Sequence, residues 1–167
     1  MDVSTKLETQ RIAVARAVIE MKQETRARIE ARAFEKGDVL AIAELAGIMA
    51  AKRTPDIIPL CHPVPLTNVQ LQHRWLQPSP GAAAQPSEAA QEPETTAWLL
   101  LEATVAAIYR TGVEMEALTA CTGAALTVYD MCKAVDRGMV IRDVRLVYKS
   151  GGQRGTFDIR ASTSAVF

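Results

Sequence analysis

The sequence has no run of apolar residues long enough to cross a membrane. The two longest candidate runs, residues 39–51 and 98–108, are interrupted by Glu44 and Glu102. A membrane-spanning helix needs about 20 consecutive apolar residues. The N-terminal residues also lack a hydrophobic signal core, which a secretory signal peptide would require. We therefore predict a soluble protein without a membrane partner.

Cysteine and histidine are scarce. The three cysteines, Cys61, Cys121 and Cys132, form no CxxC motif and leave an odd thiol. This argues against a disulfide framework and predicts the reducing cytoplasm as the compartment. The only two histidines are His62 and His73. Because a zinc site needs three or four protein ligands, no metal site is predicted.

The chain also lacks an excess of either charge. Its 19 basic and 19 acidic residues cancel, which disfavours a broad nucleic-acid interface. Neither a GxxxxGK[ST] nor a GxGxxG motif occurs, so a P-loop nucleotidase and a Rossmann dehydrogenase are disfavoured. A small-molecule ligand is the remaining expectation. At 167 residues the chain is expected to form one domain, residues 1–167.

One segment, residues 112–133, places charged side chains among apolar ones. Glu114 and Glu116 are two residues apart, so in an extended segment both carboxylates would point to the same side. Asp130 and Lys133 are three apart on a predicted helix and would share a face. A buried or half-buried carboxylate beside a lysine is a candidate acid/base pair. The plain alternative for such pairs is a solvated surface charge.

Two helices are predicted in the first third of the chain. Residues 5–32 contain no glycine or proline, and their apolar residues follow a helical period. The apolar residues on this predicted face are Leu7, Val14, Ala17, Val18, Met21 and Ile29. Gly37 then breaks the helix, Asp38 is placed to cap a second one, and Pro55 ends it.

Strands are predicted in the rest of the chain, separated by the helix in residues 112–133. A proline-rich, extended loop between residues 55 and 65 should hold Cys61 and His62 rigidly. Alternating apolar residues predict strands near 69–75, 97–109, 139–148 and 157–161. Residues 77–95, rich in Pro, Ala and Ser, have the composition of a flexible hairpin excursion. This order predicts an α+β fold, an antiparallel sheet backed by helices.

Several ordered motifs give the chain a resemblance to a known family. They are Lys36-Gly-Asp-Val, Ala51-Lys52-Arg53-Thr54, Ile58-Pro59-Leu60-Cys61-His62-Pro63, Lys149-Ser150-Gly151-Gly152 and the segment 112–133. Together they closely resemble the molybdenum cofactor biosynthesis protein C (MoaC) family of cyclic pyranopterin monophosphate synthases. The resemblance runs from residue 2 to about residue 157. It implies a ferredoxin-like core and a lyase of the phosphorus–oxygen type.

The resemblance also implies a substrate and a reaction. Enzymes of this family convert 3′,8-cyclo-7,8-dihydro-GTP to cyclic pyranopterin monophosphate with loss of diphosphate. No redox cofactor is implied, although a divalent ion can accompany the triphosphate. The family forms homohexamers, trimers of dimers, with sites at subunit boundaries. The candidate catalytic residues are Asp130, Lys133 and Lys36, and the candidate substrate-binding residues are Leu60, Cys61, His62, Met115, Glu116, Glu114, Lys52 and Lys149.

The residue types fit such a substrate. Lysine is a compact point charge that neutralises phosphate oxygens without a fixed geometry, and carboxylates can accept the N–H protons of a purine-derived ring. Which lysine acts as the acid and which holds phosphate stays open. The alternative is a nucleotide-binding or sensing module that uses the same pocket without turnover. It would not need a proton-transfer residue, so Asp130 beside Lys133 favours the enzyme.

Overall fold

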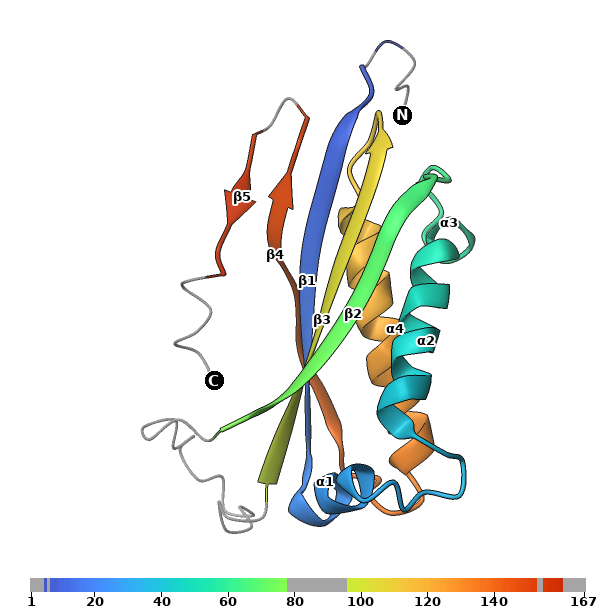
Figure 1. The fold of residues 1–167 in the computed structure, drawn as a ribbon, viewed down its shortest axis with the longest axis vertical. Helices are drawn as coiled ribbons and strands as arrows, with labels where there is room; N and C mark the ends of the chain where they lie inside the picture. Colours follow the sequence, from blue (N-terminus) through green and yellow to red (C-terminus); the bar gives the residue numbers. More distant parts are fainter. Residues whose placement is uncertain (1–4, 6, 78–95, 153–154, 161–167) are drawn as a thin grey trace.

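Within residues 5, 7–77, 96–152 and 155–160, which the computed structural model describes, one antiparallel sheet carries helices on one face (Figure 1). The sheet has the strand order β2-β3-β1-β4-β5. The elements are β1 (Thr9–Lys22), α1 (Gln23–Glu30), α2 (Val39–Lys52), α3 (Thr54–Ile57), β2 (Leu66–Leu76), β3 (Thr96–Tyr109), α4 (Glu114–Cys132), β4 (Val140–Ser150) and β5 (Phe157–Asp158). The predicted α+β fold, an antiparallel sheet backed by helices, is confirmed.

The predicted N-terminal helix over residues 5–32 is wrong. Residues Thr9–Lys22 form the strand β1, and the helix α1 begins only at Gln23. β1 lies in the middle of the sheet, paired with β3 on one edge and β4 on the other. Residues 13–15 and 17–19 are all buried, so both faces of the strand are covered. A strand buried on both faces loses the polar alternation that marks a half-buried strand.

The other predicted elements fall close to their expected positions. The Asp38 side chain caps α2 by accepting from the backbone N of Leu40 at 3.2 Å and of Ala41 at 3.1 Å. β2 and β3 pair in the predicted antiparallel arrangement. Pro55 lies in the first turn of the short helix α3, just after α2 ends. The expected excursion over residues 77–95 lies, apart from Gln77, outside the described residues.

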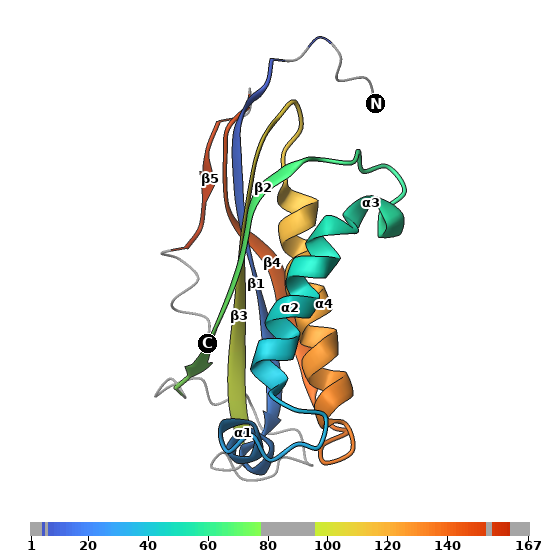
Figure 2. The same ribbon diagram turned by 45° about the vertical axis from the view of Figure 1, so that its right-hand side comes forward.

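The core lies between the sheet and the two long helices, which run antiparallel to each other (Figure 2). α4 packs on β1, β3 and β4, while α2 packs on α4 and β2. Glycines allow the helices to approach closely. A Cβ at Gly123 would lie 2.6 Å from the Cβ of Ala50, and one at Gly47 would lie 2.9 Å from the carbonyl oxygen of Ala120. None of the helices in the described part of the chain is long and apolar enough to cross a membrane.

Candidate functional site

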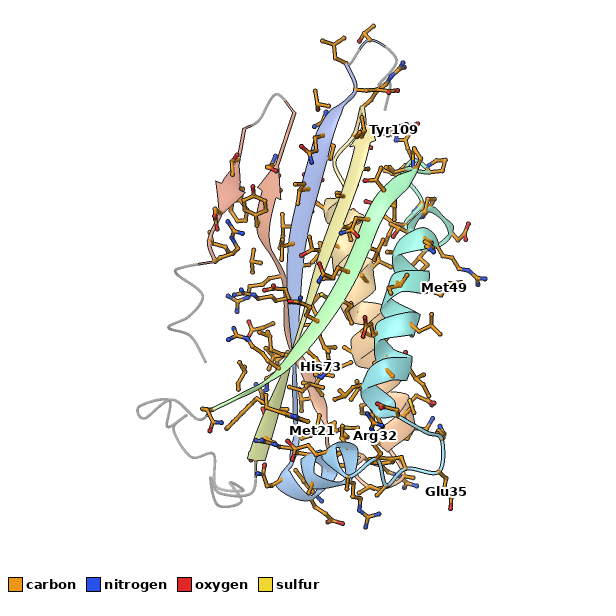
Figure 3. The ribbon with its side chains drawn as sticks, in the orientation of Figure 1. Met21, Arg32, Glu35, Met49, His73 and Tyr109 are labelled. Atoms are coloured by element: carbon orange, nitrogen blue, oxygen red, sulfur yellow. The ribbon has the colours of Figure 1, made fainter. Side chains whose placement is uncertain are left out.

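Three candidate residues meet at the C-terminal end of α4. The Nζ of Lys133 lies 2.5 Å from Oδ1 of Asp130, as their spacing on the helix predicted. Lys36 comes from the loop before α2, where Figure 3 labels its neighbours Arg32 and Glu35. Its Nζ lies 2.8 Å from Oδ2 of Asp130 and 3.2 Å from the Asp130 carbonyl oxygen. We call Lys36, Asp130 and Lys133 the lower cluster.

The lower cluster holds an ionised carboxylate. Hydrogen bonds from Lys133 and Lys36 lower the pKa of the Asp130 carboxyl from 3.8 to about 2. The expectation of a buried or half-buried Asp130 is wrong for the single chain, because 54% of its side chain is exposed. A carboxylate with this pKa can accept a proton at neutral pH but has none to donate. Any proton that the lower cluster donates must therefore come from a lysine.

The other candidates lie at the opposite end of the helical layer (Figure 2). Glu114 opens α4, and its Oε1 lies 3.9 Å from the Nζ of Lys149 near the end of β4. Lys52 ends α2, and the loop after α3 brings Cys61 close enough to Glu116 for the two groups to interact electrostatically. We call this set the upper group; its members are Lys52, Leu60, Cys61, His62, Glu114, Met115, Glu116 and Lys149.

The prediction that Glu114 and Glu116 lie in an extended segment is wrong. Both are in the first turn of α4, where the positive end of the helix dipole favours carboxylates. Residues two apart on a helix do not share a face. Glu114 is accordingly half-buried beside Lys149, whereas only 4% of Glu116 is exposed. The two acids therefore have different environments.

Burial shifts the pKa values of two members of the upper group. It raises the pKa of the Glu116 carboxyl, and the nearby Glu114 charge raises it further. Burial and the Glu116 charge also raise the pKa of the Cys61 thiol. Cys132 is a buried thiol with a pKa raised to about 12, mainly by burial. Glu116 and Asp130 thus have pKa values shifted in opposite directions, the pattern that separates acid from base roles.

Arg11 is an additional cation close to the upper group. Its Nε donates to the carbonyl oxygen of Tyr109 at 3.2 Å. Gly151 and Gly152, with φ of 93° and 80°, follow β4 and pack against Gln10 and Arg11, where a Cβ would overlap their atoms. Gly151 and Gly152 therefore allow the chain after β4 to lie close against β1. A Gly-Gly pair directly after Lys149 is the sequence feature that could have indicated this contact with Arg11.

The lower cluster and the upper group are far apart in one chain. Glu116 and Asp130 both belong to α4 and are 14 residues apart. At about 1.5 Å per residue, this spacing separates them by about 21 Å along the helix axis. Proton transfer requires contacts of about 3 Å. Within one chain, the two sets therefore cannot act on the same reacting atoms.

Comparisons with known proteins identify the family of the chain. The MoaC family matches residues 1–152. The chain belongs to the MoaC family. It is 51% identical over 157 residues to the cyclic pyranopterin monophosphate synthase of Rhodospirillum rubrum, covering 94% of this chain and 84% of that protein. The synthase of the same name from Brevibacillus brevis is 51% identical over 157 residues, 94% of this chain and 87% of that protein. That of Listeria welshimeri is 47% identical over 161 residues, 96% and 89% of the two chains.

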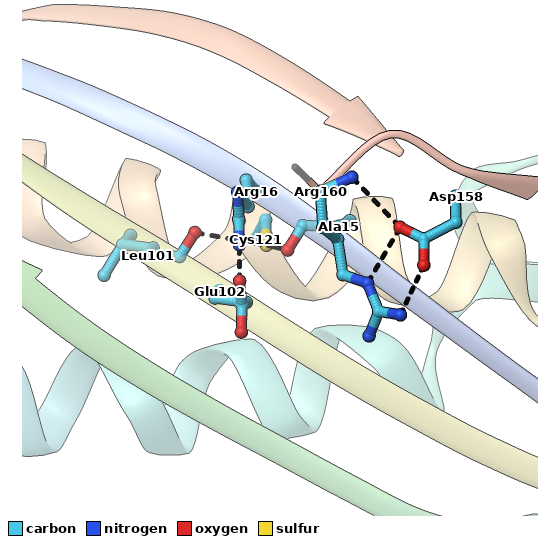
Figure 4. Close-up of polar contacts among 7 residues, drawn as sticks. All are labelled: Ala15, Arg16, Leu101, Glu102, Cys121, Asp158 and Arg160. Atoms are coloured by element: carbon cyan, nitrogen blue, oxygen red, sulfur yellow. Dashed lines mark hydrogen bonds and ion pairs between the residues drawn. The ribbon is translucent and has the colours of Figure 1, made fainter. Parts of the chain in front are cut away.

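Every candidate residue of this MoaC-family chain lies inside the matched region, yet none lines a hollow of about 300 Å³ that the structure contains. The hollow lies on the sheet face away from the helices, because its residue Arg16 alternates along β1 with the helix-facing Ala15 and Ala17. Arg16 Nε pairs there with Oε2 of Glu102 at 2.6 Å (Figure 4). The remaining lining residues are Gln72, His73, Arg74 and Leu100.

Proposed function

We propose that the chain converts 3′,8-cyclo-7,8-dihydro-GTP to cyclic pyranopterin monophosphate and releases diphosphate. Membership of the MoaC family supports this, as do relatives named cyclic pyranopterin monophosphate synthase at 47–51% identity. The observation that carries the proposal is the lower cluster. Asp130 has an ammonium group at 2.5 Å on one carboxylate oxygen and another at 2.8 Å on the other. A base and two proton donors thus stand together.

The proposed chemistry divides the work between carboxylates and lysines. Ionised Asp130 accepts a proton as the purine-derived ring opens and the pyran forms, and Lys36 or Lys133 returns one. In the phosphoryl step, a substrate hydroxyl attacks the innermost phosphorus and forms a new P–O bond, and its proton passes to water. The bond to the bridging oxygen breaks, and diphosphate leaves with the electron pair. Lysines, including Lys52 and Lys149, stabilise the charge on that leaving group.

We also propose that each site lies between two chains of a homohexamer built as a trimer of dimers. The two sets of candidate residues lie at opposite ends of α4. A two-fold axis across the middle of the helix would bring the lower cluster of each chain to the upper group of its partner, completing two equal sites. Exposed apolar side chains on α2 and α4 lie between those ends, a surface that a second copy would cover. They are Ile42, Leu45, Met49 (labelled in Figure 3) and Leu126.

Three further properties belong to the proposal. The cytoplasm is the expected compartment, supported by the free thiols Cys61, Cys121 and Cys132. The reaction needs no redox cofactor, and a divalent ion is expected only as a counter-ion of the triphosphate. The core is ferredoxin-like, which is supported by the β-α-β-β-α-β order of β1, α2, β2, β3, α4 and β4.

The deciding experiment incubates purified protein with 3′,8-cyclo-7,8-dihydro-GTP. Diphosphate release is followed together with pterin fluorescence after mild oxidation, for wild type and for Asp130→Asn. Asp158→Asn is the matched control, because Asp158 is an exposed carboxylate on β5 whose pKa of about 2 is lowered mainly by Arg160. Both products should appear with wild type and the control but not with Asp130→Asn. Tight binding of the substrate without product formation would refute the enzyme and favour a nucleotide-binding or sensing module.

A further inference from the structure

Asp136 is a buried aspartate in the loop between α4 and β4, and only 2% of it is exposed. Its Oδ2 accepts from the backbone N of Lys22 at 2.8 Å and from the Thr25 hydroxyl at 3.1 Å. Its Oδ1 accepts from the backbone N of Gly138 at 3.1 Å. Burying a charged group is costly unless it is hydrogen-bonded. These three donors explain how the carboxylate is kept in the interior.

The contacts of Asp136 join the end of α4, which carries Asp130 and Lys133, to the start of α1, which is followed by the loop that carries Lys36. On one side, Asp136 follows Lys133 by three residues, and its backbone N donates to the Cys132 carbonyl oxygen at 3.0 Å. On the other side, it accepts from Lys22, which stands at the N-cap of α1 and provides no side-chain cap. Asp136 therefore holds the start of α1 against the end of α4.

The loop from α1 to Lys36 is held by its own contacts. The backbone N of Ala33 donates to the Arg28 carbonyl oxygen at 2.9 Å. Arg32, which has a positive φ of 52°, places its Nε 3.1 Å from Oδ2 of Asp38. These contacts link the end of α1 to the start of α2, on either side of Lys36.

We infer that Asp136 is a positioning residue that holds Lys36 at its contact with Asp130. It touches neither group, and it acts by fixing the distance between the segment that carries Lys36 and the helix end that carries Asp130. The catalytic consequence of this geometry rests on the proposed function. The geometry itself does not.

The geometric test uses the Asp130 carboxyl as its reporter, followed by ¹³C NMR during an acid titration without substrate. Asp136→Asn removes one acceptor oxygen, and Thr25→Val removes only the hydroxyl donor, so the second variant serves if the first does not fold. In wild type the carboxyl should titrate at about 2. In both variants the midpoint should move toward 3.8, its ordinary value, because Lys36 no longer reaches it. Asp158 on β5 should stay unmoved in the same spectra.

Lys36→Met provides the calibration. If Asp136 acts through Lys36, then Asp136→Asn combined with Lys36→Met should shift Asp130 no further than Lys36→Met alone. An unchanged Asp130 midpoint in folded Asp136→Asn and Thr25→Val, with a clear shift in Lys36→Met, would overturn the inference. So would full additivity of the two changes. Because no substrate is present, this result is independent of whether the proposed reaction occurs.

Kinetics then test the catalytic consequence. Asp136→Asn should lower kcat about tenfold with KM within about twofold of wild type, because misplacing a catalytic group affects the reacting step more than binding. A wild-type protein that forms no product would refute the proposed function and leave the titration result standing. Wild-type kcat in a variant whose Asp130 midpoint has moved would refute the catalytic consequence alone.

Discussion

The Nζ of Lys36 lies 2.8 Å from Oδ2 of Asp130, although the two residues are 94 apart in the sequence. This contact is tertiary, since it joins the loop before α2 to the last turn of α4. Lys133 is placed by helical spacing alone, whereas Lys36 depends on the packing of the helices and on the anchoring of α1. The lower cluster is therefore a sensitive reporter of the fold around it.

The ion pairs of Asp130 should make a pH-dependent contribution to stability. The pKa of its carboxyl is about 2 in the folded chain against 3.8 ordinarily. A lowered pKa stabilises the folded state fully above the ordinary value, and this stabilisation is lost as pH falls through the lowered one. Asp130→Asn should therefore lower the free energy of unfolding more at pH 7 than at pH 2. Urea unfolding at stepped pH measures this, and an equal difference at both ends would contradict it.

A site shared between chains should be restored by mixing two inactive variants. Asp130→Asn damages the lower cluster, and Lys52→Ala damages the upper group. In random two-fold pairs, half the pairs are mixed and one of their two sites is intact, so about one quarter of wild-type activity should return. Diphosphate release after co-refolding measures the recovery. A site contained in one chain would give none, because every chain carries one damaged group.

The close packing of α2 on α4 should leave no room for a methyl group at Gly123. On an exposed helix, Gly→Ala stabilises by about 1 kcal/mol. Here the new Cβ would lie 2.6 Å from the Cβ of Ala50, so Gly123→Ala should instead destabilise by about 1–3 kcal/mol, the usual cost of overpacking. Ala50→Gly in the same chain should recover much of that loss. Urea unfolding of the two single variants and the double variant checks the sign and the coupling.

Glu116 should lower the stability of the folded chain at neutral pH while contributing to substrate binding. Burial raises the pKa of its carboxyl, so the ionised form is disfavoured in the folded chain. The resulting stability is fully present below the ordinary value of 4.5 and is lost as pH rises through the raised pKa. Glu116→Gln removes that loss and should raise the melting temperature at pH 7 while weakening substrate binding. Thermal unfolding at pH 4 and pH 7 is the measurement. A lower melting temperature at both values would show that the carboxylate is needed for folding.

The strands that face polar surroundings could be predicted from the sequence, and the central strand could not. In β2 and β3 one face is more polar, so alternation is visible around Gln70, Gln72 and Glu102. β1 is covered on both faces and contains Ala13, Ala15 and Ala17, whose small side chains fit a helix or a strand equally well. Pairing with β3 and β4 decides its conformation. That information lies more than 70 residues away in the chain.

The candidate site shows the same limit. The Asp130–Lys133 contact follows from a spacing of three on a helix. The environments of Glu114 and Glu116 were mispredicted, because the helix begins at Glu114 rather than after both acids. Asp136 gave no sequence signal, since its partners Lys22 and Thr25 become neighbours only when β1 and α1 reach the end of α4. Residue types and local periodicity predict contacts within one helix or strand, but not contacts between elements that are far apart in the sequence.

In the proposed assembly, the length of α4 would set the distance between the lower cluster and the upper group. Because one rigid helix carries Glu116 near one end and Asp130 near the other, the span between them is set by the number of residues rather than by loops that could adjust. Four extra residues in its middle would move one end by about 6 Å and turn it by about 40°. The residues of each half-site could then be unchanged, although the lower cluster of one chain would no longer meet the upper group of its partner. Chains of unequal α4 length would be incompatible partners, even if their side chains were identical.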